Sequence, residues 1–390
     1  MDTTLMLWLL GAAVALPVML LIVVGMARGM DKSGPAIKTT LPPSIAKALG
    51  VSPGATPHEV ADKTKKQTKT AVGIFTSLAV VAGIVGVAKG FNDGDVEPSI
   101  SEITAGALHG TLVDVRHRDP VVLIVPGSGP TDRDGNSAAG LSTNAYRLLA
   151  EGLAEQGIAS VRIDKRGMYD SAGAGDPNAV TPAIYAADYR AWIDAIKAER
   201  GPGSGCVFLL GHSEGALMVS LAAEGREDVC GLILVAGIGR PMGEVMRAQI
   251  RDNPANAPLV DDAMRALDEL EAGRHVDVSA MHPALQQLFA PGVQDYLISV
   301  VNIDPVEAVR RASKPTLILQ GATDMQVTRA DAKLLDSAPK TRLQIIDGMN
   351  HVLKKAPADR AANLATYADP SLPLAPKLVR RIEDFVDDED

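Results

Sequence analysis

The sequence predicts an α/β fold, in which a mostly parallel β-sheet over residues 103–390 carries helices on both faces. From about residue 103, short apolar runs alternate with amphipathic stretches, and such alternation specifies a parallel sheet between two layers of helices. Several apolar runs end directly in glycine-rich or polar loops, which is where parallel sheets form their ligand sites. A chain of 390 residues is long enough for one large domain of this kind with additional segments.

The apolar runs and amphipathic stretches give the expected order of elements. Strands are predicted at 106–115, 120–126, 158–164, 206–211, 230–236, 315–320 and 341–346. Helices are predicted near 142–156, 182–200, 213–224, 327–336 and 373–386. The long interruption at 240–305 has a charged, helical pattern, and we expect it to form a lid that covers the site. Its larger apolar side chains are candidates for an acyl pocket or for packing within the lid: Met242, Met246, Met264, Met281, Leu288, Phe289 and Tyr296.

The segment Gly211–Gly215, with the sequence Gly-His-Ser-Glu-Gly, lies between an expected strand and an expected helix. This order is typical of a nucleophile elbow, a tight turn that exposes the serine hydroxyl above a helix N-terminus. Glycines flank the turn because a side chain there would collide with the neighbouring strand or helix. The helix N-terminus favours the negative charge that develops during acyl transfer. The pattern therefore predicts a serine hydrolase with Ser213 as the nucleophile.

An acid and a histidine are expected downstream of such a serine, each in a loop after a later strand. Asp324 follows the apolar run 315–320, and His351 follows the run 341–346. Both loops would lie at the carboxyl edge of the sheet, together with the elbow. We expect His351 to act as the base and Asp324 to orient it. The other histidines lack this context, and His212, beside the nucleophile, is expected to be a packed residue of the elbow.

A glycine-rich loop follows the expected strand at 120–126 and includes Gly127, Ser128 and Gly129. An oxyanion hole combines the N–H of the residue after the nucleophile, here Glu214, with an N–H from such an earlier loop. Glycines allow the backbone to approach the developing oxyanion closely. We therefore expect Ser128, with Gly127 or Gly129 close behind, to supply the second donor; a tight turn without a ligand and a phosphate nest are the alternatives.

Five blocks together resemble a known family: Pro126–Asn136, Asp164–Gly167, Gly211–Gly215, Gly321–Asp324 and Asn350-His351. They are similar to bacterial α/β-hydrolase carboxylesterases of the serine-aminopeptidase-like branch, over roughly residues 100–386. The resemblance implies a carboxylic ester hydrolase of broad acyl specificity with a Ser-Asp-His triad. One departure is Pro126, where the family often has a histidine. We expect Arg166 to support the oxyanion loop by pairing with Asp132 or Asp134.

The first 90 residues have the pattern of a membrane anchor. Residues 5–27 and 71–88 are uncharged runs of 23 and 18 residues, long enough to cross a bilayer. A cleaved signal peptide is the alternative for the first run and a buried core helix for the second, but the residues before the first run include no Lys or Arg. Residues 91–102 are expected to be a linker.

The charges predict the orientation of this anchor. The intervening loop, residues 28–70, holds eight Lys or Arg against three acidic residues, which places it in the cytoplasm. The domain at 103–390 would then lie on the extracytoplasmic, periplasmic side of a bacterial inner membrane. With a formal net charge of −9 for the whole chain and a basic anchor loop, that domain is strongly acidic, which argues against nucleic-acid binding.

The two cysteines are the first residues of two expected strands, 206–211 and 230–236. Cys206 and Cys230 are separated by one crossover helix, so both sulfurs are expected at the amino-terminal edge of the sheet. A disulfide in an oxidising compartment and a pair of buried thiols are both compatible with this position.

The sequence therefore predicts an enzyme that cleaves small-molecule carboxylic esters through an acyl-enzyme. No spacing typical of a metal or nucleotide site is present in the sequence, and no cofactor is expected. An acyltransferase, thioesterase or peptidase would use the same triad and is the first alternative. A non-catalytic, membrane-tethered binding protein is the second.

Overall fold

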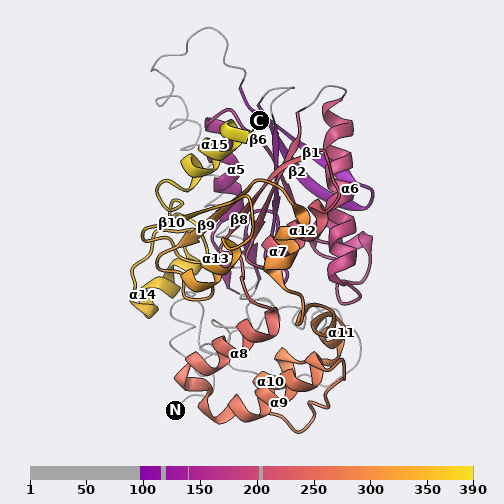
Figure 1. Ribbon diagram of the computed structural model, residues 1–390, viewed down its shortest axis with the longest axis vertical. Helices are drawn as coiled ribbons and strands as arrows, with labels where there is room; N and C mark the ends of the chain where they lie inside the picture. Colours follow the sequence, from indigo (N-terminus) through magenta and orange to yellow (C-terminus); the bar gives the residue numbers. More distant parts are fainter. Residues whose placement is uncertain (1–96, 116–119, 139, 202–204, 390) are drawn as a thin grey trace, which may run out of the picture. The chain divides into compact units, whose positions relative to one another are not determined.

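The computed structural model describes residues 97–115, 120–138, 140–201 and 205–389. Its centre is an eight-stranded sheet with the strand order β1-β2-β6-β3-β7-β8-β9-β10 (Figure 1). The strands are β1 (Ser99–Ala105), β2 (Leu108–Asp114), β3 (Val121–Val125), β6 (Ala159–Ile163), β7 (Val207–His212), β8 (Val229–Val235), β9 (Thr316–Gly321) and β10 (Thr341–Ile346). Strands from β6 to β10 pair in parallel, whereas β2 is antiparallel to both β1 and β6. The predicted mostly parallel sheet is confirmed.

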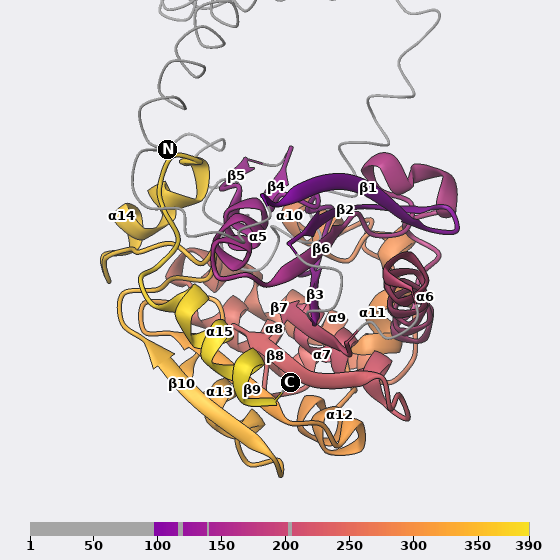
Figure 2. The ribbon, with the colours of Figure 1, turned by 90° about the horizontal axis from the view of Figure 1, so that it is seen from above.

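Helices cover both faces of the sheet, as Figures 1 and 2 show. One face packs against α6 (Pro182–Arg200), α7 (Glu214–Ala223), α12 (Pro305–Ala312) and α13 (Arg329–Leu335). The other packs against α5 (Ala145–Glu155) and α15 (Leu378–Glu389). Strand β3 shows why both faces are covered, because its apolar side chains alternate between the two faces. Val121, Leu123 and Val125 belong to the first core, and Val122 and Ile124 to the second. The sheet is therefore apolar on both sides.

A helical insertion of four α-helices and one short 3-10 helix follows β8, and it lies beyond one end of the sheet (Figure 1). It comprises α8 (Met242–Asp252), the short η3 (Pro254–Leu259), α9 (Val260–Glu271), α10 (Pro283–Leu288) and α11 (Pro291–Val300). These helices share an apolar core of their own. The helical pattern expected at 240–305 is therefore present as these helices. We keep the term helical insertion for α8–α11.

Several parts of the described chain differ from the expected elements. Strand β1 begins at Ser99, inside the predicted linker, and pairs with β2 around a turn at Gly106, whose φ is +64°. The single strand predicted at 106–115 is therefore the second arm of a hairpin. A two-stranded ribbon, β4 (Asn136–Ser137) with β5 (Leu141–Ser142), and the short helix α14 (Arg360–Ala365) were not predicted.

The predicted anchor helices at 5–27 and 71–88, their basic loop and the first half of the linker lie outside the described residues. Within the described residues, no helix is both long and apolar enough to cross a membrane.

A disulfide joins Cys206 to Cys230, whose Cα atoms are 5.5 Å apart. The bond links the amino-terminal ends of β7 and β8, where Val207 pairs with Val229. Of the two expectations left open for these cysteines, the structure has the disulfide.

Candidate active site

Ser213 lies on a sharp turn between β7 and α7. Its backbone has φ 56° and ψ −121°, a strained conformation for a residue that is not glycine. A side chain at Gly211 would collide with the carbonyl of Gly215, and a Cβ at Gly215 would lie 2.7 Å from the carbonyl oxygens of Val125 and Pro126. The two glycines are thus required by close backbone approach, as the elbow pattern predicts.

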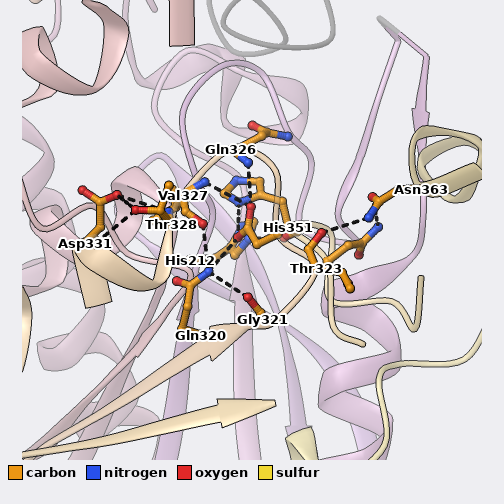
Figure 3. A network of polar contacts seen from close by, with 12 residues as sticks. His212, Gln320, Gly321, Thr323, Gln326, Val327, Thr328, Asp331, His351 and Asn363 are labelled. Carbon is orange, nitrogen blue, oxygen red and sulfur yellow. Dashed lines mark hydrogen bonds and ion pairs between the residues drawn. The ribbon is translucent and has the colours of Figure 1, made fainter. Parts of the chain in front are cut away.

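Asp324 and His351 are adjacent in space although 27 residues separate them in the chain. Asp324 Oδ2 lies 3.0 Å from His351 Nδ1, and both side chains are almost fully buried. The loop after β9 holds the carboxylate, since Asp324 Oδ1 accepts hydrogen bonds from the backbone N–H groups of Gln326 and Val327 at 2.8 and 3.0 Å. Figure 3 shows Gln326 and Val327 beside His351. The sequence expectation that these two residues meet agrees with this geometry.

The charge state of Asp324 follows from the same contacts. Burial alone would raise the pKa of this carboxyl. The charge of His351 and the hydrogen bonds from His351, Gln326 and Val327 outweigh burial and hold its pKa below the usual 3.8. The carboxylate is therefore ionised at neutral pH, as a residue that orients an imidazole must be.

Ser213 and His351 line the same two adjoining pockets. No direct hydrogen bond between the Ser213 hydroxyl and His351 is formed in the described part of the chain. In enzymes without substrate this contact is often longer than a hydrogen bond. The structure thus brings the three expected residues to one pocket, with the acid and the histidine already paired.

The loop after β3 faces Ser213 from the other side. Ser128 and Gly129 line the pocket, and the N–H of Ser128 makes no hydrogen bond to any described residue. Glu214 is the first residue of α7, where backbone N–H groups have no acceptor within the helix. The N–H of Gly127 instead donates to the hydroxyl of Tyr146 over 3.3 Å. Gly127, expected as a further donor, is therefore already engaged, and Ser128 and Glu214 remain.

A buried hydrogen-bond chain runs behind these groups. The Tyr146 hydroxyl lies 2.8 Å from His212 Nδ1, and His212 Nε2 lies 2.8 Å from the carbonyl oxygen of His351. A carbonyl only accepts, so Nε2 carries the proton. Burial, followed by the charge of His351, lowers the pKa of His212 to about 3. His212 is therefore neutral, Nδ1 is an acceptor, and Tyr146 donates to it.

The Asp164–Gly167 block supports the oxyanion loop by contacts other than the expected one. Arg166 pairs with Asp188 of α6, with Nε 2.8 Å from Oδ2, and not with Asp132 or Asp134. The loop is held instead by Arg133, whose Nε lies 2.9 Å from Asp164 Oδ2. The expectation for Arg166 was wrong because the backbone after β6 turns this side chain toward α6.

Lys165 provides a further contact. Its Nζ donates to the carbonyl oxygen of Gly127 over 2.6 Å. That oxygen belongs to the same peptide group as the Ser128 N–H, so the ammonium group fixes the orientation of that N–H and strengthens its dipole. No pattern in the sequence indicated this role.

Comparison with known proteins agrees with this geometry. A family model described as "Alpha/beta hydrolase family" matches residues 121–366, which include every residue of the site. The chain belongs to the alpha/beta hydrolase family. A curated relative, Esterase EstD of Thermotoga maritima, is 27% identical over 265 residues, which are 65% of this chain and 59% of the relative. The chain thus spans less than two thirds of that relative's length.

Solved structures similar to this hydrolase include Est1E from Butyrivibrio proteoclasticus, with 18% identity and a TM-score of 0.44 over 74% of this chain and 98% of that one. The Pyrococcus furiosus esterase PF2001 has 15% identity and a TM-score of 0.48 over 78% of this chain and 95% of that one.

The helical insertion of this hydrolase contributes one wall of the larger pocket. Of the seven apolar candidates in the sequence, Met242, Met246 and Tyr296 line it. The remaining four pack within the core of the insertion: Met264, Met281, Leu288 and Phe289. Both uses that the sequence left open therefore occur.

Five titratable residues of the described chain that are alternatives to the triad residues have structural contacts instead. Asp304 caps α12, and Asp331 caps α13 and pairs with Arg240. His282 caps α10, whereas His109 and His275 pair with Glu102 and Asp295 near the surface. None of these five lines the pocket that contains Ser213.

Proposed function

We propose that this chain is a carboxylic ester hydrolase with Ser213 as nucleophile, His351 as general base and Asp324 as orienting acid. The observation that carries the proposal is the Asp324–His351 pair in the pocket that a strained Ser213 lines. Membership of the family and a relative named as an esterase support it.

The reaction begins when the Ser213 hydroxyl attacks the ester carbonyl and His351 Nε2 takes its proton. Asp324 holds Nδ1–H, so that Nε2 faces the serine and the imidazolium is stabilised. His351 then returns the proton to the leaving alcohol. Water, activated by the same histidine, hydrolyses the acyl-enzyme and regenerates Ser213.

The negative charge of each tetrahedral intermediate would be bound by the N–H groups of Ser128 and Glu214. Lys165 holds the first of these peptide groups, and the start of α7 supplies the second. Each such donor contributes roughly 3–4 kcal/mol to the stabilisation of the transition state.

The helical insertion would act as a lid that selects the acyl group. Apart from the catalytic residues, most side chains that it and the neighbouring loops direct at Ser213 are apolar, among them Val245, Val293 and Leu297. An apolar wall favours an acyl chain and excludes water from the acyl-enzyme.

We also propose that residues 1–90 anchor the enzyme in a bacterial inner membrane, with the catalytic domain of residues 103–390 on the periplasmic side. The uncharged runs and the basic loop between them support this. A reporter that is active only outside the cytoplasm should be active when it is fused after residue 95. Activity of a reporter that works only in the cytoplasm, fused at the same position, would reject the topology.

The experiment for the activity is hydrolysis of p-nitrophenyl esters from acetate to palmitate by the full chain and by Ser213→Ala. We expect the variant to lose at least about 10⁴-fold in kcat. Ser220→Ala is a matched control, because Ser220 lies on α7, the helix that follows Ser213, and its hydroxyl donates to the Ala216 carbonyl. If the folded wild type reacts with a fluorophosphonate but cleaves no ester, an amide, thioester or acyl-transfer substrate is indicated.

A further inference from the structure

Two buried groups of opposite charge face the pocket of Ser213 and have no part in the triad. Lys165 is 3% exposed and Glu214 is 5% exposed, and both side chains line the pocket. Apart from them, the wall is mainly apolar. Burial of an ionised group is costly unless it is paired, so two such groups beside a nucleophile point to a function.

These two side chains do not neutralise each other by direct contact. No ion pair between Lys165 and Glu214 is present in the described part of the chain. Lys165 Nζ has three N–H donors, and its one acceptor is the Gly127 carbonyl at 2.6 Å. The Glu214 carboxylate accepts one hydrogen bond, from the Tyr296 hydroxyl at 2.5 Å. Lys165 therefore has N–H donors, and Glu214 has acceptor positions, that are free to bind a ligand in the same pocket.

Both groups lie beside the two N–H donors proposed to bind the reacting carbonyl. Lys165 bonds to the peptide that contains the Ser128 N–H, and Glu214 directly follows Ser213. A substrate carbonyl between those two N–H groups would have its first carbon atoms next to this charged pair. Farther along, the pocket is formed by apolar side chains of the helical insertion, such as Met242, Met246 and Val293.

We propose that Lys165 and Glu214 together recognise a hydroxyl group close to the ester carbonyl, so that the preferred substrates are esters of short hydroxyacyl chains. A hydroxyl is both an acceptor for the ammonium group and a donor to the carboxylate. A carboxylate on the substrate would be repelled by Glu214 and an ammonium group by Lys165. Tyr296 holds the Glu214 carboxylate and belongs to α11, so the insertion helps to form the subsite.

The charge state of Lys165 agrees with this recognition. Burial lowers the pKa of Lys165 to about 8, with Glu214 opposing the shift. Burial raises the pKa of Glu214, which the charge of Lys165 and the bond from Tyr296 oppose. The centre of the Tyr185 ring lies 5.8 Å from Lys165 Nζ. Burial raises the pKa of the Tyr185 hydroxyl, so this residue stays neutral. Near pH 7 Lys165 is therefore an ammonium donor.

The test rests on the proposed esterase activity and uses 4-nitrophenyl esters of butyrate and of 2- and 3-hydroxybutyrate, with the corresponding methoxy esters. The measurement is kcat/KM for each ester with the full-length protein. We expect at least one hydroxy ester to exceed butyrate by about tenfold or more. Its methoxy counterpart accepts but cannot donate, so it should lose most of that advantage.

Two variants assign the preference to the two side chains. Lys165→Met should bring the hydroxy-to-butyrate ratio close to one, whatever the absolute rate. Glu214→Gln keeps the shape and should lower mainly the hydroxy-to-methoxy ratio. Gln249→Met is the matched control, because Gln249 is another polar residue of the pocket wall whose amide donates to the Gln326 carbonyl. It should leave both ratios unchanged.

The outcomes separate this inference from the proposed function. Ser213-dependent cleavage of butyrate with no preference for either hydroxy ester overturns the hydroxyl subsite and leaves the esterase intact. A preference that survives Lys165→Met also overturns it. Absence of cleavage for every ester would instead reject the esterase.

Discussion

The Nε2–H of His212 donates to the carbonyl oxygen of His351 over 2.8 Å, so the residue before the proposed nucleophile holds the backbone of the proposed base. On its other side His212 accepts from Tyr146, which in turn accepts from the N–H of Gly127. One uninterrupted chain thus joins the oxyanion loop to the histidine loop behind Ser213. All of its members are buried, where a hydrogen bond is strong and an unpaired group is costly.

Tyr146→Phe interrupts this chain at its middle. It leaves the Gly127 N–H and His212 Nδ1 without partners, and we expect the free energy of unfolding to fall by about 1–3 kcal/mol. We also expect kcat to fall more than KM rises, because the loop geometry acts on the transition state. Thermal unfolding and steady-state kinetics measure the two effects.

A double-mutant cycle tests whether the chain acts as a unit. If it does, His212→Gln combined with Tyr146→Phe should cost clearly less than the two single changes added together. Strictly additive losses would mean that Tyr146 and His212 act independently and that the chain has no joint role.

His212 also predicts how stability depends on pH. Its pKa in the folded protein is about 3, against about 6.5 in an unfolded chain. Between these values the unfolded state binds a proton that the folded state does not, so stability falls as the pH decreases from 6.5 toward 3. The contribution of this group approaches about 1.4 kcal/mol per pH unit.

Denaturant unfolding of the wild type and of His212→Gln at several pH values between 4 and 7 isolates this contribution. Other groups, including Asp324, titrate in both proteins and cancel in the difference. The variant should show the shallower pH dependence. Equal slopes would show that the pKa of His212 is not lowered in the folded protein.

Much of the site was predictable because the features that define it are local. The elbow requires glycine at 211 and 215 within a five-residue turn, and Asp324 and His351 each follow an apolar strand that the sequence makes plain. Parallel strands bring their carboxyl ends to one edge, so local patterns were enough to bring these loops together.

The contacts that were missed depend on the direction of side chains between distant elements. Tyr146 lies in the first turn of α5 without any motif, and only the packing of α5 on the sheet aims its hydroxyl at Gly127 and His212. Arg166 and Lys165 are adjacent, yet one faces Asp188 and the other Gly127. Strand β1 was likewise missed and mostly assigned to the linker, because it is polar and mostly exposed.

Asp324→Asn should leave the fold intact and remove the carboxylate that orients His351. An asparagine amide N–H at this position donates to Nδ1 and so favours the wrong imidazole tautomer, and we expect kcat to fall by about 10⁴-fold. Asp331→Asn is a useful comparison, since Asp331 lies in the next helix, is also buried and pairs with Arg240. It should lower stability rather than kcat. Comparable kcat losses in both variants would contradict the assignment of the acid.

The Cys206–Cys230 disulfide closes a loop with a sequence separation of 24 residues that contains β7, the elbow and α7. Loop-closure entropy for this length predicts about 3 kcal/mol of stabilisation, or roughly 5–10 °C in Tm for a domain of this size. The bond lies at the amino end of β7, about 20 Å along the strand from Ser213, so esterase activity at 25 °C should change little. The double variant Cys206→Ser/Cys230→Ser should therefore unfold earlier while keeping its kcat, and reduced wild type should unfold at the same temperature as the variant. A loss of kcat in the folded double variant would mean that the disulfide also fixes the elbow.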